Sequence, residues 1–303
     1  MKLWCFDDGP GHNWGNDLAK VAQAKGIDAR IFTDPHQVDE GYVFMHMHHH
    51  PSVRIHHKRI MAHLAVNPAL TLIPDYRSSV LYDDKLEQSR QLARWMPRTR
   101  IFYSPSVARA YISNGKPKYP FISKSSEGAS SHNVRLVQNE AEALLEVRAV
   151  FSDQGIRGRH QQTQRGYLLW QEFVEGNEGD VRIIAVGQKR LILKRGNRDD
   201  KPFASGSGRL TPIADLGGEP DLYGAFAKAN EFFAGERQSW SGIDLVKEPR
   251  GEWKILECTV GWTMKGYAQC AFFNIDGTRA GDRMGSDIWE VLLNEIREGA
   301  FDA

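Results

Sequence analysis

The chain has 303 residues, of which 41% are hydrophobic and 25% are charged. This length and composition are typical of a globular protein with two or three domains and a sizeable core, and they exclude disordered and collagen-like chains. The formal net charge of +1 provides no field for nonspecific binding of nucleic acid or of an anionic membrane. No run of apolar residues reaches the roughly 20 that a membrane span needs.

The three cysteines, Cys5, Cys258 and Cys270, have no metal-type spacing and leave one thiol unpaired in any disulfide scheme. This pattern favours a reducing compartment. Asp7 and Asp8 interrupt the N-terminal segment where a signal peptide would need an apolar core. We therefore expect a cytoplasmic enzyme or binding protein, and the sequence leaves association into homo-oligomers open.

The first eighty residues alternate between strand patterns and helix patterns. Strands are predicted at residues 2–6, 28–32, 42–46 and 70–73. Helices are predicted at residues 16–25 and 55–66. Such alternation predicts a small parallel sheet with both faces covered, in a domain that spans residues 1–80.

Two features of this first domain allow more than one interpretation. The loop at residues 7–16 follows the first strand at the edge of a parallel sheet where ligands commonly bind, so it is equally compatible with a structural turn and with contact to an acceptor substrate. The second feature is a histidine-rich tract: His46, His48, His49, His50, His56, His57 and His63. No acidic or cysteine ligand completes a zinc site at a recognisable spacing. Solvated or capping imidazoles are therefore the first interpretation, substrate contact the second and metal binding the last.

A second unit is predicted over residues 81–166. Asp83 is expected to cap a helix that runs to Trp95. The polar, glycine-flanked segment at residues 154–166 is the best candidate for a linker. A third unit would then span residues 167–303.

A lysine precedes a run of small residues in the segment ISKSSEGASSHN, residues 122–133. Strands are predicted at 121–124 and 134–137, so Lys124 ends a strand just before this loop. Backbone amides and hydroxyl groups of such a loop can approach phosphate oxygens, while Lys124 supplies a point charge. The lysine comes before the small residues and no GK[ST] follows, so the segment is not a Walker A loop. Alone it is a weak signal, because small polar loops are usually turns.

Polar residues also follow or interrupt strand patterns in the third unit. Gln171 and Glu172 come after an apolar run, where they could meet the edge of an adenine. The alternative is an edge strand with two solvated side chains. Asp180 and Arg182 lie two residues apart and so share one face of a strand, as the members of a surface ion pair also would.

Asp244 and Glu257 lie on two runs joined by a turn at residues 248–251, so a hairpin would bring the two carboxylates together. Adjacent carboxylates repel unless a proton or a cation separates them, and oxygen ligands combined with phosphates suit Mg²⁺. Glu257 has apolar neighbours on both sides, which is not typical of a surface residue. This hairpin is the strongest single indication of a functional site.

Taken in order, these segments resemble the ATP-grasp superfamily, in particular the branch that contains ribosomal-protein glutamate ligases, glutathione synthetase and D-alanine:D-alanine ligase. The resemblance covers about residues 82–264 and depends on the order and spacing of the motifs. It implies an α/β (α+β) fold in which a small N-terminal parallel-sheet domain precedes two ATP-grasp subdomains. It also implies the use of ATP with Mg²⁺ or Mn²⁺ to join a small-molecule or peptide carboxylate donor to an amine acceptor.

The resemblance also implies roles for individual residues. Those implied in nucleotide binding are two phosphate lysines, a small-residue loop and an adenine hinge: Lys85, Lys124, Ser125, Ser126, Gly128, Gln171, Glu172, Phe173 and Val174. Those implied at the metal are Asp244, Glu257 and Thr259. Among the catalytic residues, Arg195 would stabilise the transferring phosphate, and Arg182, held by Asp180, would orient the substrate carboxylate.

The chain departs from the family pattern at two places. Thr259 stands where an asparagine usually follows the second carboxylate, and residues 203–209 lack the asparagine that usually precedes a glycine pair. These departures keep open a nucleotide-binding regulatory or scaffold protein without turnover, and also a kinase of the same fold. The retained lysines, carboxylates and Arg195 favour an ADP-forming carboxylate-amine ligase that works through an acyl phosphate.

Overall fold

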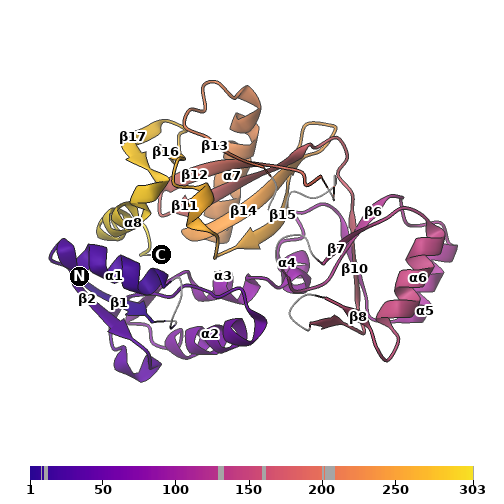
Figure 1. Cartoon of the computed structure of the whole chain (residues 1–303), viewed down its shortest axis with the longest axis horizontal. Helices are drawn as coiled ribbons and strands as arrows, with labels where there is room; N and C mark the ends of the chain where they lie inside the picture. The colour runs from indigo at the N-terminus through magenta and orange to yellow at the C-terminus, as the bar shows by residue number, and fades with distance from the viewer. Residues whose placement is uncertain are drawn as a thin grey trace.

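The computed structural model describes residues 1–7, 9, 13–128, 133–158, 162–199, 201 and 209–302, except for the side chain of Lys265. Over these residues, three sheets with flanking helices follow one another along the chain, together with one small hairpin (Figure 1). No helix in these ranges is long and apolar enough to cross a membrane.

The N-terminal domain is a four-stranded parallel sheet in the order β2-β1-β3-β4. Its elements are β1 (Lys2–Phe6), α1 (Trp14–Ala24), β2 (Asp28–Phe32), η1 (Pro35–Gln37), β3 (Gly41–Phe44), α2 (Pro51–Leu64) and β4 (Leu70–Ile73). The helix α1 begins earlier than expected, so Gly15 is helical. A Cβ at Gly15 would lie 2.1 Å from the carbonyl oxygen of Phe6, so glycine lets α1 pack closely on β1.

Two short helices, α3 (Tyr76–Leu81) and α4 (Lys85–Gln91), connect this domain to the central sheet. The expectation of one helix capped by Asp83 and running to Trp95 is wrong. Asp84 is the N-cap of α4, since its side chain accepts a hydrogen bond from the backbone N–H of Glu87 at 3.1 Å. Asp83 adopts a left-handed conformation with a φ of 49° in the turn between α3 and α4.

The central sheet has the order β5-β10-β6-β7, and all of its pairings are antiparallel. Its strands are β5 (Thr99–Phe102), β6 (Phe121–Lys124), β7 (Val134–Val137) and β10 (Leu168–Glu172). The helices α5 (Pro105–Ser113) and α6 (Glu140–Val150) pack against one face through a core that includes Phe102, Val147 and Trp170. The expected pairing of the strands on either side of the small-residue loop is confirmed.

The segment at residues 154–166 is not a linker. It contains the hairpin of β8 (Ile156–Arg157) and β9 (Thr163–Gln164), and Gln164 is buried with its amide oxygen 2.9 Å from Nη2 of Arg135. The strand β10 then pairs with β5 and β6. A boundary drawn from sheet membership therefore falls after Glu172 rather than between residues 166 and 167.

The C-terminal sheet is antiparallel, in the order β15-β14-β11-β12-β16-β17, with β13 also paired to β12. Its strands are β11 (Gly179–Val186), β12 (Lys189–Gly196), β13 (Leu210–Pro212), β14 (Trp240–Lys247), β15 (Trp253–Thr259), β16 (Ala271–Asn274) and β17 (Arg279–Met284). The associated helices are α7 (Pro220–Glu236), η3 (Met264–Gly266), η4 (Gly285–Asp287) and α8 (Ile288–Arg297).

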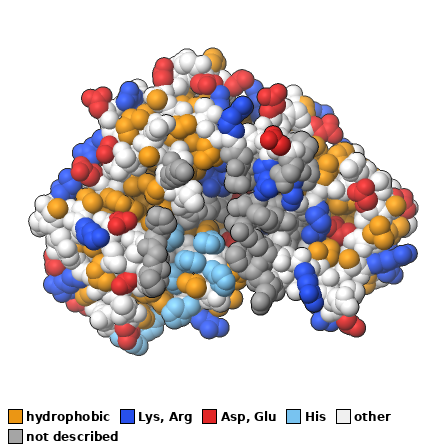
Figure 2. Space-filling model, viewed as in Figure 1, with side chains coloured by type: hydrophobic (Ala, Val, Ile, Leu, Met, Phe, Trp, Pro, Cys, Tyr) orange, Lys and Arg blue, Asp and Glu red, His pale blue; other side chains and the backbone are white. Residues whose placement is uncertain are grey.

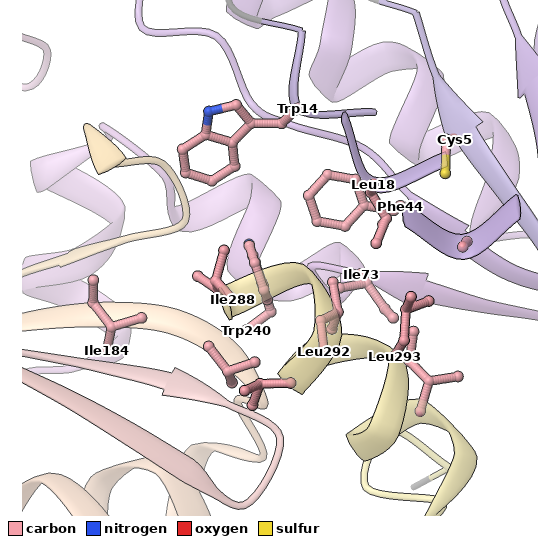
Figure 3. Packing of buried hydrophobic residues seen from close by; sticks show 14 of the residues in the cluster. Cys5, Trp14, Leu18, Phe44, Ile73, Ile184, Trp240, Ile288, Leu292 and Leu293 are labelled. Atoms are coloured by element: carbon pink, nitrogen blue, oxygen red, sulfur yellow. The ribbon is translucent and has the colours of Figure 1, made fainter. Parts of the chain in front are cut away.

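One hydrophobic core joins the first and last parts of the chain (Figure 3). Trp14 and Phe44 of the N-terminal domain pack together with Trp240 of β14 and with the apolar side of α8. A separate core lies between the opposite face of the C-terminal sheet and α7. The N-terminal domain is thus fixed against the C-terminal sheet by apolar packing.

Candidate active site

One face of four adjacent strands carries five of the predicted catalytic and metal-binding residues. In the register of β15, β14 and β11, Glu257 lies opposite Asp244, and Asp244 lies opposite Arg182. In the register of β11 and β12, Asp180 lies opposite Arg195. Paired residues of neighbouring strands point to the same face, so these five side chains form one charged cluster.

A β-bulge determines which face Glu257 occupies. Asp244 pairs with Glu257, but the next residue, Leu245, pairs with Ile255, which leaves Leu256 as the extra residue. Ile255 therefore packs into the core beneath α7, while Glu257 emerges beside Asp244. Without the bulge, residues two apart would share one face and one of the two would be misplaced.

The charged side chains pair differently from the expectation. Arg182 donates from Nε and Nη2 to the two oxygens of Asp244, at 2.5 and 2.7 Å. Arg195 donates in the same way to Asp180, at 2.6 and 2.8 Å, and its Nη2 also lies 2.5 Å from Oδ2 of Asp244. The prediction that Asp180 holds Arg182 is corrected here, because the register places Asp180 opposite Arg195 and Arg182 opposite Asp244.

This pairing keeps Asp244, Arg182 and Arg195 ionised. Burial alone would raise the pKa of Asp244, but Arg182 and Arg195 outweigh it and hold that pKa well below its usual range. Burial also opposes the charge on both guanidinium groups. Asp244 outweighs it and raises the pKa of Arg182. For Arg195, burial and the neighbouring Arg182 both oppose the charge, and Asp244 together with Asp180 outweighs them and raises the pKa. A buried cluster of this kind costs free energy unless its charges are paired or bind a ligand.

Lys85 joins the helix α4 to the cluster. Its ammonium lies 3.2 Å from Oε1 of Glu257 and 3.3 Å from Oδ1 of Asp83, and it donates to the carbonyl oxygen of Gly128 at 2.9 Å. Burial works against the charged form of Lys85, but Glu257 and Asp83 more than compensate and raise its pKa to about 12. Lys85 is therefore a permanent cation that touches both a predicted metal carboxylate and the predicted phosphate loop.

Lys124 is buried at the end of β6, on the side of the central sheet that is turned toward β15. Its ammonium donates to Oε1 of Gln171 at 2.7 Å and to the carbonyl oxygen of Leu256 at 3.4 Å. Burial lowers the pKa of Lys124 to about 8, and Glu257 offsets only part of that effect. Lys124 and Lys85 thus approach Glu257 from different elements, and the pKa of Lys85 is the higher of the two.

The first residues of the small-residue loop make several hydrogen bonds. The backbone N–H of Ser126 donates to the hydroxyl of Tyr167 at 2.7 Å, and the Ser126 hydroxyl donates to Asp84 at 2.9 Å. The hydroxyl of Ser125 donates to the carbonyl oxygen of Glu127 at 3.0 Å. The rest of the predicted loop, residues 129–131, lies outside the described residues, as does most of the serine- and glycine-rich segment 203–209.

The predicted adenine hinge is only partly open to a ligand. Gln171 is 1% exposed, its oxygen accepts from Lys124, and its nitrogen donates to the Thr99 hydroxyl at 3.0 Å. Glu172 is exposed, and Phe173 and Val174 are half-buried. A nucleotide base would therefore meet residues 172–174 more readily than the amide of Gln171.

The predicted donor set for a divalent cation is two carboxylates and one hydroxyl. Asp244 is held ionised, and Glu257 lies directly opposite it. The hydroxyl of Thr259 donates to the carbonyl oxygen of Gly261 at 2.7 Å, so only its lone pairs remain for a metal. Within the described residues, no three His, Cys, Asp or Glu side chains gather into a metal site. These residues fit Mg²⁺, which commonly takes one or two carboxylates and completes its shell with phosphate and water oxygens.

The histidine-rich tract lies over the N-terminal domain, low in the view of Figure 2. His48 stacks on His49, and its Nδ1 accepts from the backbone N–H of His50 at 2.9 Å. The tract lies close to the segment that follows β15, because a Cβ at Gly261 would be 3.1 Å from the carbonyl oxygen of Met47. Residues 8 and 10–12 of the neighbouring glycine-rich loop lie outside the described part of the chain.

Two residues near the cluster were missed or misassigned at the level of sequence. Arg54 of α2 is 2% exposed and lies 2.5 Å from Asp83. The local sequence around Arg54 carries no pattern that would indicate a partner as distant in sequence as Asp83. Asp83 was assigned as a helix cap, a role that its neighbour Asp84 fulfils.

No family model and no curated protein matches this sequence. Solved structures match its fold over nearly the whole chain. A RimK-domain ATP-grasp protein from Sphaerobacter thermophilus DSM 20745 aligns with a TM-score of 0.60 and 13% identity, covering 97% of this chain and 99% of that one. The D-cycloserine synthetase DcsG aligns with a TM-score of 0.60 and 14% identity, covering 98% and 100%.

Peptide-modifying enzymes align as well. The ATP-grasp ligase PsnB, solved with its precursor peptide PsnA2 and AMPPNP, has a TM-score of 0.55 and 12% identity, and the match covers 98% of each chain. The macrocyclase MdnC from Microcystis aeruginosa MRC, solved with its precursor peptide MdnA, has a TM-score of 0.54 and 13% identity, covering 87% of this chain and 93% of that one.

Proposed function

We propose, from the premise that this chain has the ATP-grasp fold, that it is an ATP-dependent ligase that joins a carboxylate to an amine and releases ADP. The observation that carries the proposal is the contact of Lys85 with Glu257, which joins a cation suited to phosphate to the carboxylate pair suited to Mg²⁺. Fold alone does not fix chemistry, so the argument depends on these side chains.

In this proposal ATP lies between the central and C-terminal sheets. Lys85 and Lys124 hold its phosphates, and Ser125, Ser126 and Gly128 begin the loop over them. Residues 171–174 border the adenine, mainly through Glu172, Phe173 and Val174. Asp244 and Glu257, with a lone pair of Thr259, would hold Mg²⁺ or Mn²⁺. A bound cation of this kind would neutralise phosphate charge.

The two arginines serve the acyl-transfer half of the site. The bidentate bonds of Arg195 to Asp180 fix the plane of its guanidinium, and its Nη1 can still donate to a phosphoryl or acyl oxygen. Arg182, fixed in the same way by Asp244, is suited to orient the donor carboxylate. The chemistry is transfer of the γ-phosphoryl group to the donor carboxylate, followed by attack of the amine on the acyl phosphate with loss of phosphate. The protein contributes mostly position and fixed charge.

The donor and acceptor belong to the small-molecule or peptide classes, since DcsG is a synthetase of a small molecule and PsnB and MdnC bind precursor peptides. The buried thiols of Cys5, Cys258 and Cys270 agree with a reducing, cytoplasmic location. Assembly into homo-oligomers stays a prediction.

A nucleotide-binding protein without turnover is the second candidate. The observation in its favour is that three N–H groups of Arg182 and Arg195 already occupy the oxygens of Asp244, so that a metal ion must compete with two cations there. A kinase with an alcohol acceptor would use the same nucleotide site.

Two measurements test the proposal. Calorimetry with Mg-ATP should show binding that Lys124→Ala weakens by at least about tenfold and that Lys247→Ala, at a partly exposed lysine on β14, leaves unchanged. Screening of amino acids and peptides with hydroxylamine should then give a hydroxamate together with ADP and phosphate. A stable phosphorylated product would indicate the kinase instead, and nucleotide binding without ADP release across the screen would indicate the regulatory protein. Absence of binding at millimolar Mg-ATP would contradict every nucleotide-based function.

A further inference from the structure

Arg54, Asp83 and Glu127 form a junction between three parts of the chain. Arg54 comes from α2 of the N-terminal domain, and its Nη1 donates to Oδ2 of Asp83 at 2.5 Å while its Nη2 donates to Glu127 at 2.9 Å. Asp83 lies in the turn between α3 and α4, and Glu127 lies in the small-residue loop after β6. A single buried guanidinium therefore connects the N-terminal domain with both the loop and the segment that carries Lys85.

Asp83 and Lys85 together hold both backbone groups of Gly128. The N–H of Gly128 donates to Oδ1 of Asp83 at 2.9 Å, and the carbonyl oxygen of Gly128 accepts from Nζ of Lys85 at 2.9 Å. Gly128 has a φ of 120°, and a Cβ there would lie 2.3 Å from Nδ2 of Asn133. A side chain would be strained at this φ, so the position favours glycine, and two side chains hold its backbone groups.

This arrangement is costly where it stands. Asp83 is buried and has a left-handed φ of 49°, a conformation that non-glycine residues adopt uncommonly although aspartate and asparagine tolerate it better than most, and Arg54 is buried with it. Backbone strain and buried charge persist where the surroundings hold them in place, and they concentrate at functional sites. The Arg54–Asp83 pair meets this description, since its partners are a nucleotide lysine and the loop above the phosphates.

We propose that Arg54 and Asp83 are positioning residues that fix Lys85 and the start of the phosphate loop, so that the N-terminal domain takes part in nucleotide binding. The inference depends on the proposed function, because it acts through Lys85 and Gly128. It goes beyond that function by assigning part of the nucleotide affinity to a helix outside the two ATP-grasp subdomains.

A purely structural ion pair would give a different result from a positioning pair. Loss of a structural pair lowers the melting temperature and leaves the affinity of the folded protein for nucleotide unchanged. Loss of a positioning pair weakens that affinity at temperatures where the protein stays folded. The dissociation constant for Mg-ATP, measured by calorimetry well below the melting temperature, separates the two.

The test uses the full chain with Asp83→Asn, Arg54→Lys and Glu127→Gln. Asp83→Asn removes the charge that holds Lys85 and Arg54, and we expect Mg-ATP binding at least about tenfold weaker. Arg54→Lys keeps the charge but loses the planar fork whose separate nitrogens reach Asp83 and Glu127, so an intermediate loss is expected. Glu127 is 41% exposed in its side chain, so Glu127→Gln should weaken binding by about threefold with little change in melting temperature.

The matched control is Arg190→Met. Arg190 is as deeply buried as Arg54, but it bonds to Asn230 and to the backbone carbonyl oxygen of Gly187, away from the charged cluster. It should lower the melting temperature and leave the dissociation constant for Mg-ATP unchanged.

The proposal is overturned if Asp83→Asn and Glu127→Gln bind Mg-ATP as tightly as the parent protein. If Asp83→Asn does not fold, the other two variants decide in the same way. If the parent protein itself binds no nucleotide, the proposed function fails, and this inference fails with it. If the parent binds and all three variants bind equally well, only the positioning role is wrong.

Discussion

One face of the C-terminal sheet carries charged side chains at one end of its central strands and apolar side chains at the other. On β11, Asp180 and Arg182 are followed on the same face by Ile184 and Val186. On β14, Asp244 shares its face with Trp240. The charged half bonds to itself and to Lys85, whereas the apolar half packs against α1 and α8 in the core shown in Figure 3.

The two halves use the same backbone geometry for different purposes. The apolar half stabilises the fold by burying side chains and holds the N-terminal domain in place. The charged half contributes less to the free energy of unfolding, since buried ion pairs are often no more stabilising than apolar side chains of similar volume. Under the proposed function the charged half serves ligand binding and chemistry, so substitutions in the two halves should separate stability from function.

The largest expected effect lies in the apolar half. Trp240 is 2% exposed and packs against Trp14, Phe44, Trp262 and Trp289. Trp240→Ala should lower the free energy of unfolding by about 3–5 kcal/mol, because it opens a cavity in that core. Urea unfolding measures the loss, with the exposed Tyr103→Ala as the control. A loss under about 1 kcal/mol, or a changed Mg-ATP affinity in the folded variant, would contradict the separation of the two halves.

The charged half should respond in the opposite way. Glu257→Gln preserves the shape of the side chain, and Lys85 keeps its contacts with Asp83 and Gly128, so the free energy of unfolding should change little. ADP formation should fall by about 100- to 1,000-fold, because a group beside the transferring phosphate loses its charge. Glu252→Gln, which changes an exposed carboxylate on the same hairpin that pairs with Lys254, is the control. An unfolded variant, or normal turnover, would make Glu257 a structural residue.

The sequence predicted which residues belong to the charged cluster better than it predicted which of their side chains form ion pairs. The i, i+2 spacing of Asp180 and Arg182 and the turn at residues 248–251 are local signals, and the face and the hairpin they predict are both present. The partner of each side chain depends on the register between strands, which no local pattern encodes. For that reason the pairing of Asp180 with Arg195 was missed.

In the fold as well, local signals were predicted from the sequence and long-range contacts were not. Strands β1, β2 and β4 begin and end where the sequence placed them, because an apolar run between glycine, proline or polar breaks is a local signal. The segment at residues 154–166 has the composition of a linker, yet Gln164 is buried against Arg135, a partner distant in sequence. The bulge at Leu256 and the left-handed Asp83 likewise depend on tertiary contacts that composition does not reveal.

The smallest expected effect is a pH dependence that originates at Lys124. Burial lowers the pKa of Lys124 to about 8, whereas Lys85, beside Glu257 and Asp83, stays charged. If Lys124 binds phosphate, nucleotide binding requires its protonated form. Above about pH 8 the free protein must therefore take up a proton to bind, and the affinity should fall by at most about tenfold per pH unit. Calorimetry in buffers of different ionisation enthalpy would detect that proton.

Lys124 has the opposite effect on stability: the affinity for Mg-ATP should fall as the pH rises, whereas the free energy of unfolding should increase. The pKa of Lys124 in the folded state is below its unfolded value of about 10.4. Between about pH 8 and that value, the unfolded chain therefore binds more protons than the folded one. In this range Lys124 makes unfolding less favourable as the pH rises. Lys124→Met should remove both trends, while Lys247→Met, at a partly exposed lysine, should remove neither. An affinity for Mg-ATP that stays constant from pH 7 to 9.5 in the parent protein would mean that Lys124 does not meet the phosphates, and the nucleotide half of the cluster would then depend on Lys85 alone.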